Sequence, residues 1–413
     1  MVILRPYQAR CIEAARGLYR DGKRSLCIVA PCGAGKTILG ATIASSAAKR
    51  GAVLWLAHRH ELCDQARAKL PPSVRVATIQ GLLASGDRPP ATVVVYDEAH
   101  HLLAGVWRGL ADHYRDALRI GLTATPERAD GQPLGDVFDG LVVAASYSEL
   151  LAGGWIVPCD VIAPASRKSS LALPAAEAVR AYAGDRQVIV FCSTVQEARD
   201  CAAALPLAEC VDGGTPGEIR LDRVTAFRAG QIRALSSVFC LSEGFDAPET
   251  AACVLARGTG HASTYLQMAG RALRPAPGKT RALLVDLCGS VHEHGFPTDD
   301  RDYSLTGKAI RRRGDSKPTV WQCKTCGRCY AAAPADRNCP ACGARILEPK
   351  KLTIARRRLE RRDRNASAPP DAKMRAWHEF VAQARARRYK MGWAYFRFLA
   401  RFGHAPPRGD TSA

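Results

Sequence analysis

Short apolar runs rich in β-branched residues alternate with Ala- and Leu-rich stretches along the first 145 residues. Four runs have the length of buried strands: SLCIVA (25–30), AVLWLAHR (52–59), TVVVYDEAH (92–100) and RIGLTATP (119–126). Strands that alternate with helical stretches favour a parallel sheet with helices on both faces. The first third of the chain is therefore predicted to be an α/β domain.

The same pattern recurs further along the chain. Strands are predicted at RQVIVFC (186–192), ALSSVFC (234–240), AACVLARG (251–258) and RALLVDLCG (281–289). The stretches TVQEARDCAAAL and TYLQMAGRALR are predicted to be helices between them. We therefore expect a second α/β domain in tandem with the first, at residues 1–148 and 149–295, with the boundary near LLAGGWIVP (150–158).

The stretch APCGAGKT (30–37) lies between a predicted strand and a predicted helix, which is the context of a phosphate-binding loop. Gly33 and Gly35 allow backbone N–H groups to turn toward phosphate oxygens. Lys36 supplies a positive charge, and the Thr37 hydroxyl can bind Mg²⁺. The remaining residues of the expected loop are Pro31, Cys32 and Ala34. The usual G-x-x-x-x-G-K-[ST] pattern begins with glycine, whereas this chain has Ala30, and a chance match is the alternative.

An acidic pair follows at the end of the third predicted strand. Asp97 is expected to hold Mg²⁺ through its water shell, because a hard cation prefers oxygen ligands. Glu98 is expected to orient and deprotonate an attacking water. The alternative is a solvated acidic loop.

Two arginines lie in YLQMAGRALRP (265–275) of the second domain. Arg271 and Arg274 are three residues apart, so on a helix they share one face. Cations from a second domain can stabilise the charge that develops on a transferred phosphoryl group. We predict that both arginines reach the nucleotide; a surface basic helix is the alternative.

The overall charge narrows the choice of partner. The 413 residues carry 59 Lys and Arg against 39 Asp and Glu, a net charge of +20, which favours nucleic acid or an anionic membrane. No apolar run approaches the about 18 residues that a membrane span needs, and the N-terminal segment lacks the features of a signal peptide. We therefore expect a cytoplasmic protein without a membrane partner. The sequence leaves the oligomeric state open.

The sixteen cysteines fall into two groups. Eleven are scattered singly and are typical of small buried hydrophobes in a reducing compartment. Two C-x₂-C pairs, each followed by a glycine, predict four thiolate ligands of a structural Zn²⁺: Cys323, Cys326, Cys339 and Cys342. Two disulfides are the alternative, and Cys329 is left without a role. This zinc ribbon is placed at residues 321–346, after a linker at 296–320.

The C-terminal region, residues 347–413, is basic and predicted to be partly helical. Its aromatic residues have two open interpretations. They can stack on exposed bases of nucleic acid, or they can pack the segment onto the second domain because they recur at helical spacing. The residues concerned are Trp393, Tyr395, Phe396 and Phe398.

Seven motifs occur in the order found in superfamily 2 helicases. They are RPYQ (5–8), APCGAGKT (30–37), LAHRHEL (56–62), DEAH (97–100), TAT (123–125), SEGFDAP (242–248) and QMAGRALR (267–274). The sequence resembles the DEAH-type DNA branch of that superfamily, in particular RadD-type and phage helicases with a C-terminal zinc finger. The resemblance implies two tandem RecA-like domains that bind ATP and Mg²⁺. It also implies nucleic acid as the partner, and it favours DNA over RNA.

The resemblance also implies roles for single residues. Arg5 and Gln8 would read the adenine, and Gly244 and Asp246 would contact the nucleotide from the second domain. Arg271 and Arg274 would be arginine fingers. Four residues would contact the nucleic acid or link it to hydrolysis: His58, Arg59, Thr123 and Thr125.

The leading hypothesis is an ATP-dependent DNA helicase or translocase. The alternatives are an ATP-gated nucleic-acid clamp or remodeller without processive motion, an RNA helicase, and a P-loop kinase or small-molecule ATPase with an unrelated zinc ribbon. The histidine-rich VHEHG (291–295) lacks an accompanying acidic cluster and is expected to be a polar loop rather than a metal site.

Overall fold

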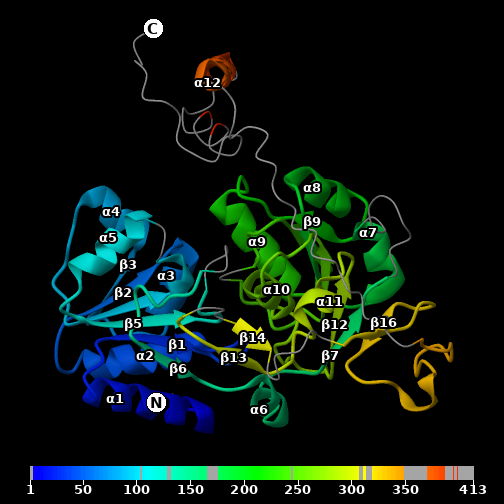
Figure 1. Ribbon diagram of the computed structural model, residues 1–413, viewed down its shortest axis with the longest axis horizontal. Helices are drawn as coiled ribbons and strands as arrows, with labels where there is room; N and C mark the ends of the chain where they lie inside the picture. Colours follow the sequence, from blue (N-terminus) through cyan, green and yellow to red (C-terminus); the bar gives the residue numbers. More distant parts are fainter. Residues whose placement is uncertain are drawn as a thin grey trace. The chain divides into compact units, whose positions relative to one another are not determined.

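The structure is a computed structural model. It describes residues 3–102, 105–127, 132–164, 175–242, 245–306, 310–312, 319–347 and 370–386, together with Ala394 and Phe398. The chain forms two compact units, Met1–Pro349 and Lys350–Ala413. The larger unit contains two sheets, drawn in blue to cyan and in green to yellow in Figure 1.

The first sheet has six parallel strands in the order β3-β2-β4-β5-β1-β6. Its strands are β1 (Ser25–Val29), β2 (Val53–Ala57), β3 (Val74–Thr78), β4 (Val93–Asp97), β5 (Leu118–Thr123) and β6 (Gly140–Val143). Its helices are α1 (Pro6–Arg20), α2 (Lys36–Ala47), α3 (His60–Arg67), α4 (Ile79–Ser85), the 3₁₀ turn η1 (Ala99–His101), α5 (Gly105–His113) and α6 (Tyr147–Ala152). β3 and β6 were not among the strands predicted from the sequence.

Helices cover both faces of this sheet because successive strand residues point to opposite sides. In β1, Leu26 and Ile28 pack into the cluster that contains residues of α1 and α2, whereas Cys27 and Val29 pack into the cluster that contains residues of α4 and α5. The fully buried Trp55 fits against α2 because Gly40 has no side chain, and a Cβ there would lie 2.6 Å from the indole ring.

The second sheet has eight strands in the order β15-β16-β7-β12-β11-β8-β10-β9. The strands are β7 (Cys159–Ile162), β8 (Val188–Cys192), β9 (Ala208–Cys210), β10 (Ala234–Ser237), β11 (Ala252–Ala256), β12 (Ala282–Asp286), β15 (Trp321–Gln322) and β16 (Arg328–Tyr330). The helices are α7 (Ala175–Ala178), the π turn η2 (Val179–Ala183), α8 (Val195–Ala203), α9 (Gly217–Arg228), α10 (Ala262–Ala269), α11 (Ser290–His294) and the 3₁₀ turn η3 (Ala335–Arg337). The six strands from β7 to β9 are parallel, so the two α/β domains expected from the sequence are confirmed.

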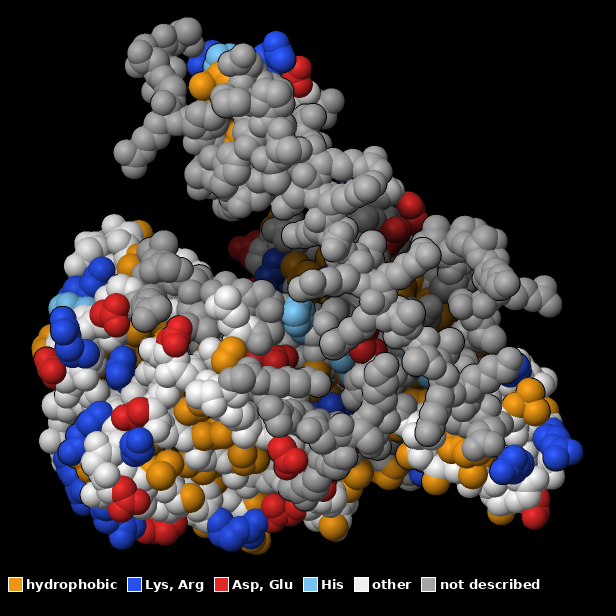
Figure 2. Space-filling view, in the orientation of Figure 1, with side chains coloured by type: hydrophobic (Ala, Val, Ile, Leu, Met, Phe, Trp, Pro, Cys, Tyr) orange, Lys and Arg blue, Asp and Glu red, His pale blue; other side chains and the backbone are white. Residues whose placement is uncertain are grey.

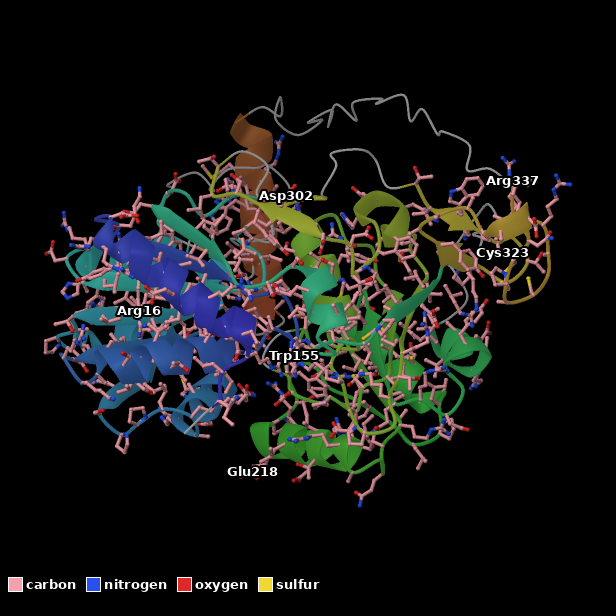
Figure 3. All side chains as sticks on the ribbon, turned by 90° about the horizontal axis from the view of Figure 1, so that it is seen from below. Arg16, Trp155, Glu218, Asp302, Cys323 and Arg337 are labelled. Atoms are coloured by element: carbon pink, nitrogen blue, oxygen red, sulfur yellow. The ribbon has the colours of Figure 1, made fainter. Side chains whose placement is uncertain are left out.

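The cysteine-rich segment extends this second sheet. Its strand β16 pairs antiparallel with β7, and β15 pairs antiparallel with β16. Asp160 of β7 accepts two hydrogen bonds from Arg281, at 3.1 and 2.6 Å, and lies 3.7 Å from Arg328 of β16. Figure 3 shows Cys323 at the far end of the second domain from Trp155. The ribbon is therefore docked on the edge of the sheet.

The helix predicted at residues 264–274 is shorter than expected. α10 ends at Ala269, so Arg271 and Arg274 do not lie on one helix face, and the inference from helical spacing was wrong. After Gly270 the N–H groups bond to carbonyls three residues back, as in Arg271 N to Met268 O at 3.2 Å. Gly270 is the C-cap residue of α10, and glycine is a poor helix former, which favours an end of the helix at this point.

The region from residue 290 to 312 also differs from expectation. VHEHG was expected to be a loop, but residues 290–294 form α11. The Asp286 carboxylate accepts hydrogen bonds from the N–H groups of Cys288 and Val291, at 3.2 and 2.7 Å, and these bonds start the helix. In the segment predicted as a linker, β13 (Arg301–Tyr303) and β14 (Ile310–Arg312) form an antiparallel pair.

The smaller unit contains α12 (Pro370–Ala386), whose described part forms a small core with Phe398. Phe398 is fully buried, and its ring lies perpendicular to that of Trp377 at 5.9 Å between centroids. Phe398 therefore packs in a core of the smaller unit, and the packing of this segment onto the second domain stays a prediction. Trp393, Tyr395 and Phe396 lie outside the described residues. Among the described helices, none has the apolar length that a bilayer crossing requires.

Candidate nucleotide-binding and metal sites

The loop between β1 and α2 turns through two glycines. Gly33 has a φ of +90° and Gly35 a φ of +72°, which residues with a Cβ rarely adopt. A Cβ on Gly33 would lie 2.5 Å from Cγ2 of Ile156, so the loop packs closely against the connector between the two domains. α2 begins at Lys36, directly after Gly35, and its first N–H groups therefore face the loop. This geometry suits an anion at the helix N-terminus.

Arg5 and Gln8 brace this loop from α1. Gln8 Nε2 donates to Ala34 O at 3.1 Å, and Gln8 Oε1 accepts from Arg5 N at 3.0 Å. The Arg5 guanidinium donates to Gly33 O at 3.3 Å. Both residues were predicted to read adenine. Arg5 lines the cavity described below, whereas Gln8 is buried under the loop with its amide bonded to the backbone.

Lys36 faces two buried carboxylates. Its Nζ forms an ion pair with Glu98 and lies 3.8 Å from Oδ1 of Asp97 at the end of β4. Burial lowers the pKa of Lys36, but the charges of Glu98 and Asp97 outweigh that effect and raise it above its ordinary value. Burial raises the pKa of Asp97 to about 6, although Lys36 acts in the opposite direction. One cation against two carboxylates leaves a net negative site, and these oxygens fit Mg²⁺.

A chain of buried contacts leads from Glu98 to the end of β5. His100 Nδ1 lies 3.5 Å from Glu98 Oε2 and 3.2 Å from Thr123 Oγ1. Thr123 Oγ1 donates to Thr125 O at 2.6 Å and accepts from Thr125 N at 3.1 Å. No role was predicted for His100 from the sequence, although the DEAH motif contains it. The carboxylate pair is thus physically connected to the threonines.

The second domain contributes its arginines from the segment after α10. Arg271 is buried and donates to Ser242 O, at 3.1 and 2.6 Å, and to Phe245 O at 2.6 Å. Arg274 forms an ion pair with Asp246. Burial lowers the pKa of Arg274, and the charge of Arg271 adds to this. Gly244 lies outside the described residues.

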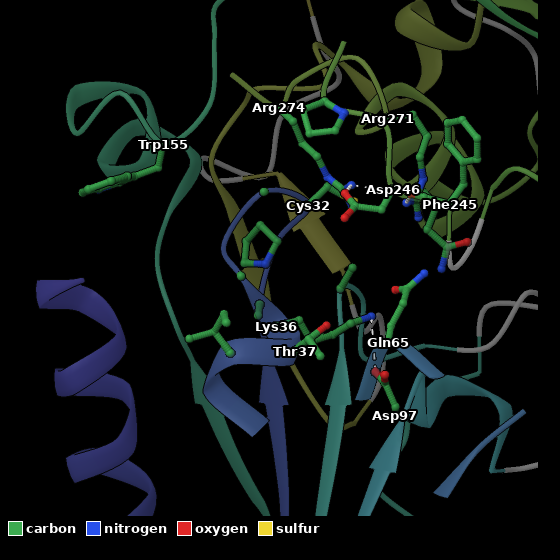
Figure 4. A pocket seen from close by; sticks show the side chains of 18 of the residues that line it. Cys32, Lys36, Thr37, Gln65, Asp97, Trp155, Phe245, Asp246, Arg271 and Arg274 are labelled. Atoms are coloured by element: carbon green, nitrogen blue, oxygen red, sulfur yellow. Dashed lines mark hydrogen bonds and ion pairs between the residues drawn. The ribbon is translucent and has the colours of Figure 1, made fainter. Parts of the chain in front are cut away.

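One cavity of about 310 Å³ gathers these groups. Figure 4 shows Lys36, Thr37 and Asp97 on one side of it, with Arg271 and Arg274 opposite. Its other lining residues from the predicted site are Arg5, Pro31, Cys32, Gly33, Gly35, Glu98 and Asp246. Its volume is within the range of small-molecule sites. The cavity therefore contains charged side chains of both signs, and both domains contribute to its lining.

Trp155 also lines this cavity, although no role was predicted for it from the sequence. It lies in the connector where the two domains meet (Figure 3). The Arg5 guanidinium lies 4.2 Å from the centroid of its ring. Gly153 leaves room for the indole, because a Cβ there would collide with it. The usable signal was a tryptophan directly after two glycines at a predicted domain boundary.

Arg59 and its neighbours join the two domains beside the cavity. Arg59 donates to Cys240 O at 3.2 Å, and Glu61 forms an ion pair with Arg220 at 2.9 Å. The His58 ring packs against that of His101, with centroids 4.4 Å apart. His58 and Arg59 were predicted to contact nucleic acid; in this structure Arg59 reaches the second domain.

The four predicted zinc ligands come together in the ribbon. Their sulfur atoms all lie within 4.8 Å of one another, with 3.5 Å between Cys323 and Cys342 and 3.6 Å between Cys326 and Cys339. Tetrahedral bonds of about 2.3 Å to Zn²⁺ place sulfur atoms about 3.8 Å apart. The thiol set therefore fits zinc. The Cys329 thiol points instead to Gly327 O, at 3.5 Å.

Two sheets built mainly of parallel strands share a cavity, with a glycine loop on one and two arginines on the other, and they define a P-loop ATPase core of two RecA-like domains. The matches to known families agree. Residues 1–88 and 74–128 match the family described as "Type III restriction enzyme, res subunit", and residues 175–276 match "Helicase conserved C-terminal domain". The chain thus belongs with the superfamily 2 helicases as a helicase-type ATPase.

Three similar proteins illustrate the relationship. A "51.5 kDa protein" of a Lactococcus phage is 27% identical over 76% of this chain and 77% of its own length. The "DNA 3'-5' helicase XPB" of Kineococcus radiotolerans is 29% identical over 66% of this chain, which spans 57% of that protein. The structure of a putative HsdR subunit of a type I restriction enzyme from Vibrio vulnificus has a TM-score of 0.57 at 22% identity, over 72% of this chain and 68% of that one.

Proposed function

We propose that this protein is an ATP-dependent DNA helicase or translocase. The observation that carries the proposal is the shared cavity, in which Lys36 and Asp97 of the first domain face Arg271 and Arg274 of the second. ATP bound there would touch both domains, so its hydrolysis would change how they hold each other. Two domain arrangements with different grips on a strand are sufficient for a motor.

Each side chain has a chemical task in this proposal. The loop N–H groups and Lys36 would bind the outer phosphates, and Thr37 and Asp97 would hold Mg²⁺, which offsets phosphate charge when bound. Lys36 is paired with Glu98 in this structure. Phosphate oxygens would compete for Lys36, and the released Glu98 carboxylate would accept a proton from the attacking water. Arg271 and Arg274 would stabilise the developing negative charge.

DNA is proposed as the substrate on two grounds. The XPB relative is named a DNA helicase, and the chain has a net charge of +20. Figure 2 shows basic side chains mixed with acidic ones over the first domain, so the charge there is not one continuous patch. The DEAH motif and the zinc-binding ribbon support a RadD-like subtype within the superfamily.

The parts of the chain are assigned accordingly. Residues 1–148 and 149–295 are the two motor domains, and residues 296–320 connect them to the zinc ribbon at 321–346. Residues 347–413 are proposed to select or hold the nucleic acid. All sixteen cysteines are free of disulfides, which fits a reducing compartment such as the cytoplasm.

Strand displacement tests the proposal. Unwinding of a labelled DNA duplex that requires ATP and stops with a non-hydrolysable analogue supports a motor, whereas binding without turnover-dependent displacement supports a clamp. Parallel RNA duplexes at matched salt separate DNA from RNA specificity.

Two arginines of the second domain, Arg274 and Arg233, provide a test variant and its matched control. Arg274→Ala is expected to lower nucleic-acid-stimulated turnover about 100-fold. Arg233→Ala removes another second-domain arginine that pairs with an aspartate but does not line the cavity, and it should leave turnover unchanged. Normal turnover in Arg274→Ala, with no stimulation by DNA, would instead support a small-molecule ATPase or kinase.

A further inference from the structure

The ammonium group of Lys279 bonds to three backbone carbonyls next to the nucleotide cavity. Its Nζ donates to Pro248 O at 3.0 Å, and to Thr250 O and Arg274 O at 2.5 Å each. A lysine ammonium has three N–H donors, so every donor has one carbonyl partner. Pro248 and Arg274 line the cavity, whereas Lys279 does not. Lys279 is therefore joined to the site without touching a ligand bound in it.

These bonds connect both partners of an ion pair that lines the cavity. Arg274 pairs with Asp246 on one side of the cavity (Figure 4). Asp246 belongs to the loop after β10, and Lys279 bonds to the carbonyls of Pro248 and Thr250 further along the same loop. Its third bond is to the carbonyl of Arg274. One ammonium group thus holds the backbone on both sides of the ion pair.

A tight turn at PAPGK (275–279) brings Lys279 back to Arg274. The Lys279 N–H donates to Ala276 O at 3.0 Å, which closes the turn. Gly278 has a φ of +74°, which residues with a Cβ rarely adopt. Because the turn reverses the chain, the side chain of Lys279 reaches a carbonyl five residues earlier in the sequence.

We propose that Lys279 is a positioning residue that fixes the Arg274 guanidinium opposite the phosphate-binding loop. A cation stabilises a transition state only where it is held at the place at which negative charge develops. A misplacement of about 1 Å can cost about 100-fold in rate. The inference rests on the proposed function, because that function assigns Arg274 to the developing charge.

The charge state of Lys279 provides an independent readout. Burial lowers the pKa of Lys279 to about 8, and the charge of Arg274 acts in the same direction, while Glu249 opposes it. The thiols of Cys253 and Cys159 also face the amine, and burial raises the pKa of each, so both are uncharged near pH 8. A neutral amine has only two N–H donors and cannot bond to three carbonyls. The positioning should therefore weaken as the pH rises through about 8.

Steady-state ATP turnover at saturating single-stranded DNA tests the proposal. Lys279→Met keeps a similar side-chain length and removes the charge and the donors. It is expected to lower kcat about tenfold while the KM for ATP stays within about twofold, because Arg274 acts on the transition state. The ratio of wild-type to Lys279→Met kcat should shrink toward one as the pH rises from about 7 to about 9. Lys279→Arg keeps the charge and should retain most of the turnover at both pH values.

A double-mutant cycle separates positioning from a general loss of structure. In an Arg274→Ala background, Lys279→Met should leave kcat unchanged, because the group that it positions is absent. Arg301→Met is the control. Arg301 also donates to two backbone carbonyls, His294 O at 2.9 Å and Phe296 O at 3.0 Å, but it does not line the nucleotide cavity. Its loss should lower stability in denaturant unfolding and leave turnover unchanged.

The possible outcomes are distinct. A wild-type kcat in Lys279→Met would overturn the proposal, as would additive losses in the double variant with Arg274→Ala. A loss confined to the KM for ATP would also overturn it. If Lys279→Met does not fold, a kcat of Lys279→Arg that falls with pH as steeply as the wild-type kcat would contradict the proposal. A wild-type chain whose ATP turnover is not stimulated by nucleic acid would instead refute the proposed function.

Discussion

Replacing Thr123 with valine tests whether the contacts from Glu98 to the TAT turn couple hydrolysis to nucleic acid. Valine has nearly the same shape but no hydroxyl. The Thr123 hydroxyl bonds to His100 and twice to Thr125, and both threonines are fully buried. Each such bond contributes about 1 kcal/mol net, and a buried partner left unbonded costs about 1–3 kcal/mol. We therefore expect Thr123→Val to lower the free energy of unfolding by about 2–3 kcal/mol.

The functional effect is expected in the coupling rather than in binding. His100 loses a buried partner that positions it beside Glu98, so stimulation of ATP turnover by DNA should fall about tenfold, equivalent to about 1.4 kcal/mol of coupling. Thr123→Ser is the control, because it keeps the hydroxyl and loses one methyl group. Turnover with and without single-stranded DNA, together with denaturant unfolding, measures both effects. Wild-type stimulation in Thr123→Val, despite the loss of stability, would refute the coupling through Thr123.

Three further predictions concern other parts of the molecule. Cys326→Ala should abolish zinc binding and increase hydrogen exchange in β16 and β7, whereas Cys329→Ala should keep its zinc, as measured by a zinc assay and exchange mass spectrometry. The bonds from Arg281 hold the pKa of Asp160 below its usual value, so this carboxylate stabilises the fold above about pH 4 and loses its effect as the pH falls through the folded pKa. Asp160→Asn should accordingly unfold more easily than the wild type at pH 7, and denaturant titrations should show the difference shrinking as the pH falls below about 4. Trp155→Ala should raise the KM for ATP several-fold in steady-state kinetics while Trp155→Phe stays near the wild-type value, because the indole and Arg5 stack beside the nucleotide cavity.

The strands could be predicted because their signal is local. β1 and β4 are continuous apolar runs, and in the structure all of their residues are buried. A parallel sheet brings the carboxyl ends of such strands to one edge, so the positions of Lys36 and Asp97 follow once the strands are known. The cluster of four cysteines could equally be predicted from the sequence, because C-x₂-C spacing alone brings each pair of thiols together.

The features that the sequence did not reveal depend on distant segments. Arg271 and Arg274 reach the cavity from a turn rather than a helix, because α10 ends at Ala269 although the helical periodicity of the sequence continues beyond it. The contact between Trp155 and Arg5 joins segments about 150 residues apart, so the position of Trp155 at the domain boundary could be predicted but not its partner. The pairing of β16 with β7 joins segments about 165 residues apart, and no local pattern encodes such a partner.

The docked ribbon has a consequence for solubility. Without β16, strand β7 would be the outermost strand of the second sheet and would present unpaired N–H and C=O groups to other molecules. The ribbon covers that edge and leaves β15, only two residues long, in its place. The four thiols hold the ribbon together, and the ribbon prevents strands of other molecules from pairing with β7. After a chelator has removed the zinc, the protein should accordingly self-associate into β-rich aggregates under conditions in which its motor domains are still folded.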